Sequence, residues 1–286
     1  MEVKIENWIE SSGEAYVESR KAVHIILRAI SDSEQLSATM IMKGGTLLGL
    51  RYGSTRYTTD IDFSTRLKYI DFDEEGFVQE FNDRLDVAAA ELGYGVRCRL
   101  QACKVMPNAS GTFPTLKIKI GYASFNSAAR MKRLEDGQSA TVINIDYSFN
   151  EDSYNTEVIQ IDDGAEFVAY SVIDIVAEKI RSILQQKVRG RNREQDIYDL
   201  NFLLLSTEFT DQEKYSILDS LIRKSEGRGL DELLGGHGIR DEEVRARSAE
   251  RYGDLRDTVD ELPDFNESYE KVARFFESLP WEMFGK

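Results

Sequence analysis

Two aspartates stand two residues apart near the end of residues 39–64, a segment that reads TMIMKGGTLLGLRYGSTRYTTDIDFS. The residues around them alternate as in a β-strand, so the carboxylates of Asp60 and Asp62 point to the same face. Two like charges held side by side are costly unless a proton or a cation relieves the repulsion, and near pH 7 the usual relief is a divalent metal ion. The spacing therefore indicates a metal site, although most D-x-D pairs are only surface charges at the end of a strand.

A glycine pair precedes these aspartates in the same segment. Gly44 and Gly45 let the backbone approach a ligand closely, and Thr46 is placed to cap the short helix that follows. The first turn of such a helix offers unpaired N–H groups and the positive end of a dipole, both of which favour phosphate. A glycine pair alone indicates only a turn. Followed by the two aspartates, it indicates a site for a metal-bound nucleotide.

The order of these features resembles the opening signature of the nucleotidyltransferase superfamily, in which a glycine pair is followed at a short interval by D-x-D. Within that superfamily, KGGT, Arg56 and DIDF are most similar to the AbiEii-type toxin family, whose members read KGGTAL followed by R-x-S-x-D-x-D-F. Thr58 stands where that family usually has Ser. The resemblance implies that the two aspartates bind metal and that the glycine turn, together with Thr46, cradles a triphosphate.

Hydrophobic periodicity predicts the elements that position this segment. The expected elements are helices over residues 12–30 and 73–92 and strands over residues 96–105, 116–122 and 142–149. With the D-I-D strand these form a mixed or antiparallel sheet with helices on one face, an α/β (α+β) fold. After these strands, from about residue 171, the hydrophobic pattern is helical. Together with this pattern, the family resemblance implies a nucleotidyltransferase-like mixed sheet core with an N-terminal helix in residues 1–165 and a C-terminal helical domain in residues 166–286.

A third aspartate lies in the last of these strands. Asp146 shares a strand face with Asn144 and Ser148, and a lone aspartate in a strand is often only a surface charge. Two-metal phosphoryl chemistry, however, commonly needs another carboxylate on a neighbouring strand. The family resemblance agrees, because a strand of the form L-x-L-D-I-x-F falls at this place. It implies that Asp146 is the third metal ligand.

One lysine interrupts an apolar helix face in the C-terminal half. Ser171 and Asp174 read as a capping box that opens a helix, and Lys179 falls inside the apolar stripe of that helix. Its ammonium either snorkels to the rim or reaches into a cleft and pairs with anionic groups, and the pattern alone favours neither. AbiEii-type relatives carry a Glu-Lys pair here that is read as part of the active site. The resemblance therefore implies a catalytic role for Lys179.

A basic loop, KVRGRNR, covers residues 187–193 and leads into another helix. Arg193, Asp196 and Asp199 recur every three residues and so line one side of that helix, and an ordinary solvated helix end is the alternative interpretation. The pattern resembles the R-x-[RK]-D-x-x-D box that closes the AbiEii-type pattern, although Gln195 replaces a base. By that resemblance Arg193 binds the nucleotide, and Asp196 either orients a basic side chain or contacts the nucleotide.

The composition argues against several classes of protein. No run of about 18 apolar residues occurs, so no membrane span is expected, and the acidic N-terminal residues give no secretory signal, which predicts a cytoplasmic location. The net charge of −15 argues against indiscriminate binding of nucleic acid. Cys98 and Cys103 lack the partners of a zinc knuckle and are expected as reduced thiols. An RNA would need a local basic surface, for which the available residues are Lys117, Lys119, Arg130, Lys132, Arg133 and the KVRGRNR loop.

The resemblance covers about residues 39–205 and implies that a nucleotide binds in the cleft between the core and the helical domain. The expected activity is transfer of a nucleoside monophosphate from an NTP to an acceptor, with Mg²⁺ as the cofactor. By resemblance the acceptor is the 3′ end of a tRNA, and the protein is a toxin of a toxin–antitoxin or phage-defence system with a cognate antitoxin. The expected catalytic residues are Asp60, Asp62, Asp146, Lys179 and Asp196, and the expected nucleotide-binding residues are Gly44, Gly45, Thr46 and Arg193.

Two other functions remain open from the sequence. A binding module could retain the nucleotide without transferring it, although the repelling D-x-D pair would then serve no purpose. Mg²⁺-dependent NTP binding without any product would favour this module. A small-molecule nucleotidyltransferase, as among antibiotic-modifying members of the superfamily, would keep the chemistry and change the acceptor. Its activity would be insensitive to added salt, whereas RNA binding weakens steeply with ionic strength.

Overall fold

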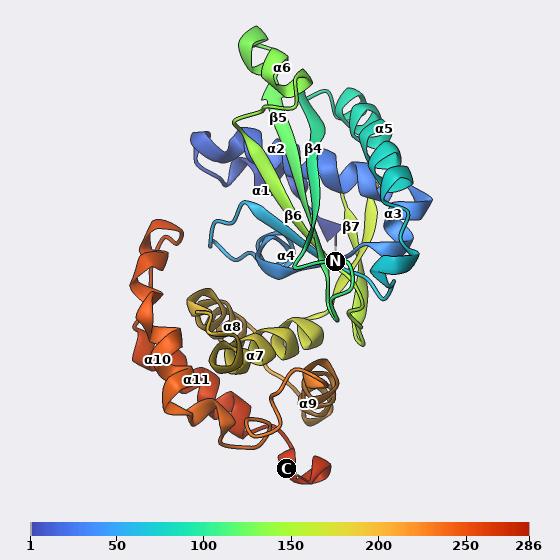
Figure 1. Cartoon of the computed structure of the whole chain (residues 1–286). Coiled ribbons are helices and arrows are strands. Elements are labelled where there is room, and N and C mark those ends of the chain that lie inside the picture. Colours follow the sequence, from blue (N-terminus) through green and yellow to red (C-terminus); the bar gives the residue numbers. More distant parts are fainter. Residues whose placement is uncertain (1, 286) are drawn as a thin grey trace. The chain divides into compact units, whose positions relative to one another are not determined.

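The computed structural model describes residues 2–285, and the chain forms two compact units (Figure 1). The core unit consists of Met1–Arg51 and Thr58–Ala169, and the helical unit consists of Tyr52–Tyr57 and Tyr170–Lys286. The segment Tyr52–Tyr57 thus belongs with the helical unit, although it lies between two elements of the core unit in the sequence. Over the described residues, no helix is long and apolar enough to cross a membrane.

An eight-stranded sheet forms the centre of the core unit, in the strand order β1-β7-β8-β2-β3-β6-β5-β4. β3 runs parallel to β6, whereas β2 runs antiparallel to β3 and β5 runs antiparallel to β6. The sheet is therefore mixed, which confirms the fold class predicted from the sequence. The strands are β1 (Glu2–Val3), β2 (Ile41–Lys43), β3 (Asp60–Ser64), β4 (Val96–Met106), β5 (Thr115–Ser124), β6 (Val142–Ser148), β7 (Thr156–Ile161) and β8 (Glu166–Tyr170).

Helices of the core unit pack beside this sheet, and α2 and α5 also contact each other (Figure 1). The sequence sets the ends of α5, because the Asp73 side chain accepts a hydrogen bond from the Gly76 backbone N–H at 3.0 Å and Gly93 adopts the left-handed conformation that stops the helix. The helices are α1 (Ile5–Glu10), α2 (Glu14–Ser31), α3 (Glu34–Thr39), α4 (Gly44–Tyr52), α5 (Glu74–Leu92) and α6 (Ala128–Glu135).

The two faces of the central strands differ in polarity. Phe63 of β3 and Tyr147 of β6 are direct neighbours on one face, where both are fully buried. The Tyr147 ring stacks on Phe77 of α5 with 5.9 Å between ring centroids. Burying one such side chain stabilises a fold by about 1.5–3 kcal/mol. Because successive residues of a strand alternate faces, this apolar face fixes the aspartates of β3 and β6 on the opposite one.

The helical unit begins with a long amphipathic helix, α7, which packs against α8, α9 and α10. Its polar residues inside the packing are paired, since Asp174 accepts a hydrogen bond from Ser220 at 2.7 Å and lies 3.3 Å from the buried ammonium of Lys224. The helices are α7 (Val172–Arg189), α8 (Glu194–Ser206), α9 (Asp211–Ser225), α10 (Glu242–Glu250) and α11 (Phe265–Glu277).

Two capping predictions were wrong. α7 does begin directly after Ser171, but the Ser171 hydroxyl makes no capping bond, and the Asp174 carboxylate is engaged with α9 rather than with the helix end. Thr46 is the third residue of α4 rather than its cap, and its buried hydroxyl donates to the Asp60 backbone carbonyl at 2.7 Å. The Asp174 carboxylate and the Thr46 hydroxyl, which the local pattern assigned to helix ends, thus bond residues distant in the sequence instead.

The strands over residues 96–149 and the two predicted N-terminal helices are confirmed within two residues at each end. Within the described residues, the missed helices and strands are β1, α1, α3, α6, β7 and β8. Thr39 ends α3 instead of beginning a strand, so only Ile41–Lys43 pairs in the sheet before the glycine turn. Cys98 and Cys103 are free thiols, as expected.

Candidate functional site

The glycine turn lies directly against the second aspartate of the D-x-D pair. Gly44 follows β2 and adopts a left-handed φ of 80°. A β-carbon at this position would stand 2.8 Å from Cγ and 2.9 Å from Cβ of Asp62, well inside van der Waals contact. Only glycine therefore allows the backbone at the start of α4 to approach this carboxylate so closely.

Register brings the three predicted aspartates onto one face of the sheet. Asp62 of β3 and Asp146 of β6 are direct neighbours in the parallel pairing, and Asp60 lies opposite Asn144 two residues earlier. Neighbouring strands are about 4.8 Å apart, so the Asp62 and Asp146 backbones hold two carboxylates side by side. Asp62 and Asp146 are half-buried, and Asp60 is exposed. The sequence prediction that these residues share a face is confirmed.

Polar neighbours hold two of these carboxylates. The Lys117 ammonium of β5 donates to Asp146, its register partner, and the Asn144 side-chain amide donates to Oδ1 of Asp60 at 3.1 Å. As these side chains stand, no group of three or more His, Cys, Asp or Glu residues within 2–285 is arranged to hold a metal ion. The three predicted metal ligands thus lie on one surface without converging on a point.

The donor set nevertheless fits a divalent cation carrying phosphate. Carboxylate oxygens are the ligands that Mg²⁺ prefers, and two of them come from adjacent strands at Asp62 and Asp146. The backbone at Gly44 leaves beside Asp62 the space that a β-carbon would fill. Gly45 and Thr46 continue the first turn of the nine-residue helix α4, whose N–H groups suit a phosphate. A cation shared with Asp146 would compete with Lys117 for that carboxylate.

A buried ion pair beside this surface was not anticipated. Lys43, the lysine of KGGT, is the register partner of Asp62 across β2 and β3. Its ammonium donates to Glu151, and both side chains are about nine-tenths buried. The available signal was a lysine at the end of an otherwise apolar strand, because a buried ammonium needs a carboxylate partner. The sequence did not indicate that the partner lies 108 residues away.

Within the helical unit, Lys179 joins two carboxylates of the next helix. Its ammonium donates to Oδ1 of Asp196 at 2.9 Å and to Oδ2 of Asp199 at 2.6 Å. All three side chains are at least nine-tenths buried. Lys179 therefore does not snorkel, and the sequence alternative in which it pairs with anionic groups is the one observed.

Arg56 completes this network. Its guanidinium makes two parallel hydrogen bonds to Asp199, of 2.7 Å from Nε and 2.8 Å from Nη2. Arg56 lies in Tyr52–Tyr57, and the neighbouring Tyr57 backbone N–H donates to the Thr258 carbonyl at 2.7 Å. Through Arg56, Asp199 thus fixes the segment Tyr52–Tyr57, which precedes the D-x-D strand, within the helical unit. The sequence placed Asp199 on the correct helix side without identifying its partners.

The charges of the network support one another. Burial lowers the pKa of Lys179, but the adjacent Asp196 and Asp199 carboxylates outweigh it and hold that pKa above the usual value. Burial likewise raises the pKa of Asp199, and Lys179 and Arg56 more than compensate, so the pKa of this carboxyl is lowered. Lys179, Arg56 and Asp199 therefore remain ionised inside the helical unit.

One atom of this network lacks a partner. Oδ2 of Asp196 is buried and accepts no hydrogen bond from any described residue. An unsatisfied buried carboxylate oxygen costs roughly 1–3 kcal/mol or more. Arg193, at the start of the same helix, uses its backbone N–H to bond Gln186 Oε1 at 2.6 Å, and it is half-buried. Asp196 thus offers one acceptor to a ligand donor.

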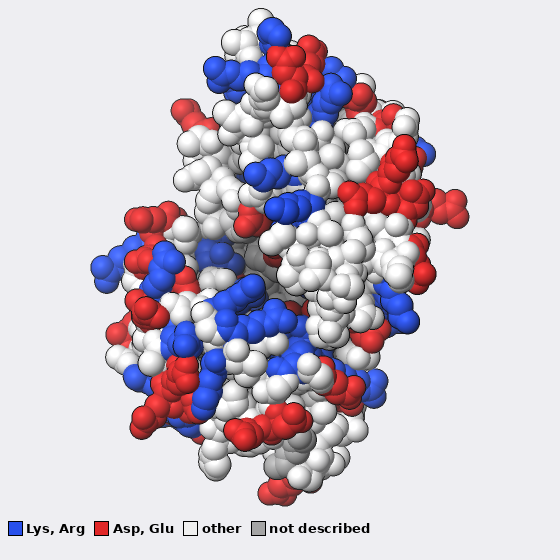
Figure 2. Space-filling view, in the orientation of Figure 1, with Lys and Arg blue, Asp and Glu red and all other residues white. Residues whose placement is uncertain are grey.

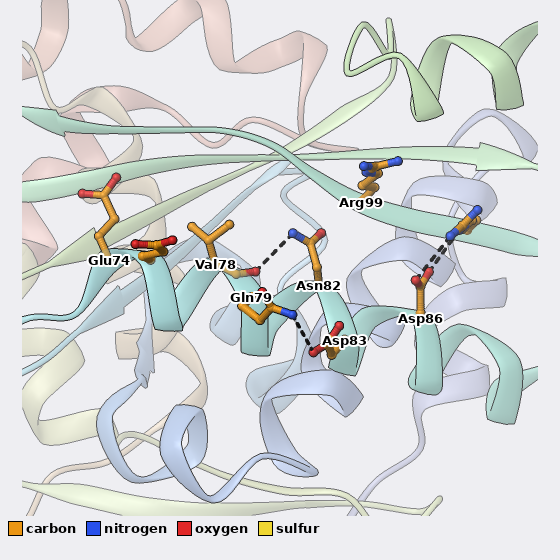
Figure 3. A pocket seen from close by; sticks show the side chains of 9 residues that line it. Glu74, Val78, Gln79, Asn82, Asp83, Asp86 and Arg99 are labelled. Atoms are coloured by element: carbon orange, nitrogen blue, oxygen red, sulfur yellow. Dashed lines mark hydrogen bonds and ion pairs between the residues drawn. The ribbon is translucent and has the colours of Figure 1, made fainter.

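The core unit also contains a groove of about 650 Å³ between α5 and β4 (Figure 3). Glu74, Asp83 and Asp86 project into it from α5, and Arg97 of β4 pairs with Asp86 at 3.0 Å. None of the predicted site residues lines this groove. Four of the nine residues that line the groove are acidic, and the groove is distinct from the surface that carries Asp60, Asp62 and Asp146.

Comparison with known proteins identifies a family over most of the chain. The model of a family described as "Nucleotidyl transferase AbiEii toxin, Type IV TA system" matches residues 25–275. No curated protein matches the chain.

Three of the solved structures with a similar fold are from Helicobacter pylori and Mycobacterium tuberculosis. JHP933 from Helicobacter pylori has a TM-score of 0.55 at 15% identity, over 96% of this chain and 95% of that one. Another H. pylori protein, assigned to the nucleotidyltransferases, has a TM-score of 0.54 at 14% identity, over 96% and 98%. MenT4, a nucleotidyltransferase toxin from Mycobacterium tuberculosis H37Rv, has a TM-score of 0.50 at 16% identity, over 96% and 97%. At these identities the likeness shows a shared fold.

Proposed function

Because the chain belongs to the AbiEii family of nucleotidyl transferase toxins, we propose that it transfers a nucleoside monophosphate from an NTP to the 3′ end of a tRNA in a Mg²⁺-dependent reaction. The observation that carries this proposal is the pairing of Asp62 with Asp146 on neighbouring strands, with the backbone of Gly44 packed against Asp62. This arrangement supplies carboxylates for a cation and backbone N–H groups for phosphate on one surface.

The reaction requires an acceptor hydroxyl to attack the α-phosphorus of the NTP while the bond to the β-phosphate oxygen breaks and pyrophosphate leaves. Asp60, Asp62 and Asp146 would hold Mg²⁺, which neutralises the phosphate charge that shifts in the transition state. Asp146 would also accept the hydroxyl proton as a general base. Gly44, Gly45 and Thr46 present the helix start to the triphosphate, although the Thr46 hydroxyl itself is already bonded to Asp60.

The helical unit contributes charge and position to the same reaction. Arg193 binds phosphate oxygens, and the unpaired Oδ2 of Asp196 accepts a hydrogen bond from a hydroxyl or amino group of the nucleotide. Lys179 is fully engaged with Asp196 and Asp199, so its first contribution is to fix Asp196 in place. A direct contact of Lys179 with phosphate would require one of these bonds to exchange.

The proposal extends to the biological setting. The family is described as a type IV toxin–antitoxin system, so a cognate antitoxin is the expected protein partner. Addition of a nucleotide to the 3′ end of a tRNA blocks aminoacylation there, which would arrest growth in a toxin–antitoxin or phage-defence system.

The direct test is incubation of the purified protein with each α-labelled NTP, Mg²⁺ and total tRNA. We expect label in tRNA with at least one NTP, its loss on addition of EDTA, and a loss of about 100-fold or more in Asp62→Asn. Asp83→Asn, which removes an exposed carboxylate from α5 of the same unit, is the matched control and should transfer normally.

The acceptor is tested with tRNA whose 3′-terminal ribose has been oxidised by periodate, which removes the attacking hydroxyl. Transfer to this tRNA should disappear. Mg²⁺-dependent NTP binding without any labelled product would contradict the proposal and favour a nucleotide-binding module. Transfer to a small molecule that resists added salt would keep the chemistry and replace the acceptor.

A further inference from the structure

Three arginines without carboxylate partners gather where α7 ends. α7 finishes at Arg189, Gly190 turns the chain with a left-handed φ of 59°, and Arg191 and Arg193 follow. The guanidinium groups of these three arginines form no ion pair or hydrogen bond with any described residue. In a chain with 51 acidic and 36 basic residues, such a cluster departs from the average surface.

A fourth arginine comes from a distant part of the sequence. Arg228 lies in the loop after α9, and its neighbour Gly229 packs on the end of α7. A β-carbon on Gly229 would be 3.7 Å from Cγ1 of Val188, which is ordinary van der Waals contact. The loop thus places half-buried Arg228 beside exposed Arg189. Figure 2 shows Lys and Arg side chains gathered over α7 and α8.

Two carboxylates close to this loop are engaged with other side chains. Asp241 accepts a hydrogen bond from Lys187 at 2.7 Å, and Glu250 accepts one from Asn192 at 2.8 Å. The charges that act on Arg189 come from other arginines. Burial lowers the pKa of Arg189, and so do the charges of four neighbouring arginines, at positions 228, 181, 191 and 193. Like charges held together in this way are relieved by an anion that contacts several of them at once.

We propose that Arg189, Arg191 and Arg228, the arginine cluster, bind the sugar-phosphate backbone of the acceptor RNA. This inference rests on the proposed function only for the class of acceptor. Guanidinium groups match phosphate oxygens with two parallel hydrogen bonds. Arg189 and Arg191 stand exposed on either side of Gly190, so they suit phosphates spaced along a strand better than one compact triphosphate.

The test measures binding of fluorescein-labelled tRNA by anisotropy, without NTP, from 50 to 200 mM KCl. The variant is Arg189→Gln with Arg191→Gln, both exposed positions. Loss of two phosphate contacts should weaken binding about tenfold at 100 mM salt and reduce the slope of log K against log salt by about 1.5. Arg274→Gln is the matched control, since it removes one exposed arginine of the same unit that already pairs with Glu270. It should bind within about twofold of wild type.

Two further readouts separate the outcomes. The thermal midpoint of the double variant should equal that of wild type, and its affinity for NTP in Mg²⁺ by calorimetry should stay within about twofold. Unchanged tRNA affinity and salt slope, or weaker NTP binding with normal tRNA binding, would overturn the assignment of this surface. If wild type binds tRNA through the arginines but transfers no nucleotide, the surface assignment stands and the proposed activity fails. If transfer occurs and the double variant binds normally, only the surface assignment fails.

Discussion

The backbone of Gly44 packs against the side chain of Asp62, so that a β-carbon on the glycine would stand 2.8 Å from the carboxylate carbon. This contact, rather than the conformational freedom of a turn alone, explains a glycine in front of α4. The contact also explains why the glycine pair and the D-x-D pair occur together in the sequence motif, because the turn and the D-x-D strand position each other.

Gly44→Ala should therefore slow transfer on the order of 100-fold while the protein still folds. The added methyl group displaces the Asp62 carboxylate by about 1 Å, and a shift of that size at a reacting group costs on the order of 100-fold. The variant should also lose stability, because alanine in the left-handed conformation, with the φ of 80° observed here, costs roughly 1–2 kcal/mol. Measurement of transfer and of the thermal midpoint separates the two effects.

Gly164→Ala is the control for this variant. Gly164 also has a left-handed φ, of 91°, but nothing lies within 4 Å of its β-carbon position. It should lose similar stability and keep its activity. Equal activity of Gly44→Ala and Gly164→Ala would show that the close approach to Asp62 has no functional importance.

In the proposed site, Lys117 would compete with a metal ion for Asp146, to which its ammonium donates. The pair is partly exposed, so it is worth about 0.2–1 kcal/mol, and Lys117→Gln should leave the thermal midpoint nearly unchanged. Removal of the competing ammonium should tighten binding of Mn²⁺, used as a probe for Mg²⁺, by up to about fivefold in calorimetry. Lys119→Gln, two residues along the same strand and opposite Asn144, removes the same charge without freeing a carboxylate. If both variants bind Mn²⁺ with equal affinity, Lys117 does not compete with the metal ion for Asp146.

Local periodicity was sufficient to predict which residues share a face. Alternation placed Asp60 and Asp62 together and opposed them to Ile61 and Phe63, because burial of one strand face fixes every side chain of that strand. The same reasoning marked Lys179 as unusual, since an ammonium in an apolar stripe must find a carboxylate.

Pairings between distant segments could not be predicted in this way. The order of strands that sets Asp62 beside Asp146 is a property of the whole sheet, and no local pattern encodes it. Arg56 and Asp199 are 143 residues apart, and nothing near either one indicates the other. β7 was missed because half of its six residues are polar and only Ile159 and Ile161 are buried.

The buried network allows the structural role of Lys179 to be separated from a chemical one. Lys179→Met leaves Asp196 and Asp199 with one positive partner, Arg56, and loss of one side of a buried ion pair typically costs about 3–5 kcal/mol. The double variant Lys179→Met with Asp196→Asn restores the charge balance of the network, because it leaves one arginine, Arg56, paired with one aspartate, Asp199. It should recover at least about half of the lost free energy of unfolding in a double-mutant cycle.

Transfer activity of that double variant is the informative measurement. A folded but inactive double variant would show that Lys179 or Asp196 contributes to the reaction beyond holding the helical unit together. Full activity in a refolded double variant would reduce both residues to structural partners. Equal thermal midpoints of the single and double variants would contradict the charge balance inferred for the network.

Stability in mild acid should depend on His24. This buried side chain bonds the Tyr94 hydroxyl at 2.8 Å and Asp163 at 3.0 Å, while Arg28 faces the same carboxylate at 3.4 Å. Burial lowers the pKa of His24 despite the attraction of Asp163. The unfolded chain therefore binds a proton more readily than the folded one, so the stabilisation is complete above about pH 6.5 and is lost as the pH falls through the lowered pKa.

Calorimetry at pH 7.5, 6.5 and 5.5 checks this expectation. The thermal midpoint of wild type should fall by roughly 2–4 °C over the range, the shift that about 1 kcal/mol produces in a chain of this size. His24→Gln can keep one hydrogen bond without titrating, so its midpoint should be lower at pH 7.5 but nearly independent of pH. A wild-type midpoint that rises on acidification would mean that Asp163 holds His24 protonated in the folded state, because only a raised pKa stabilises the fold as the pH falls.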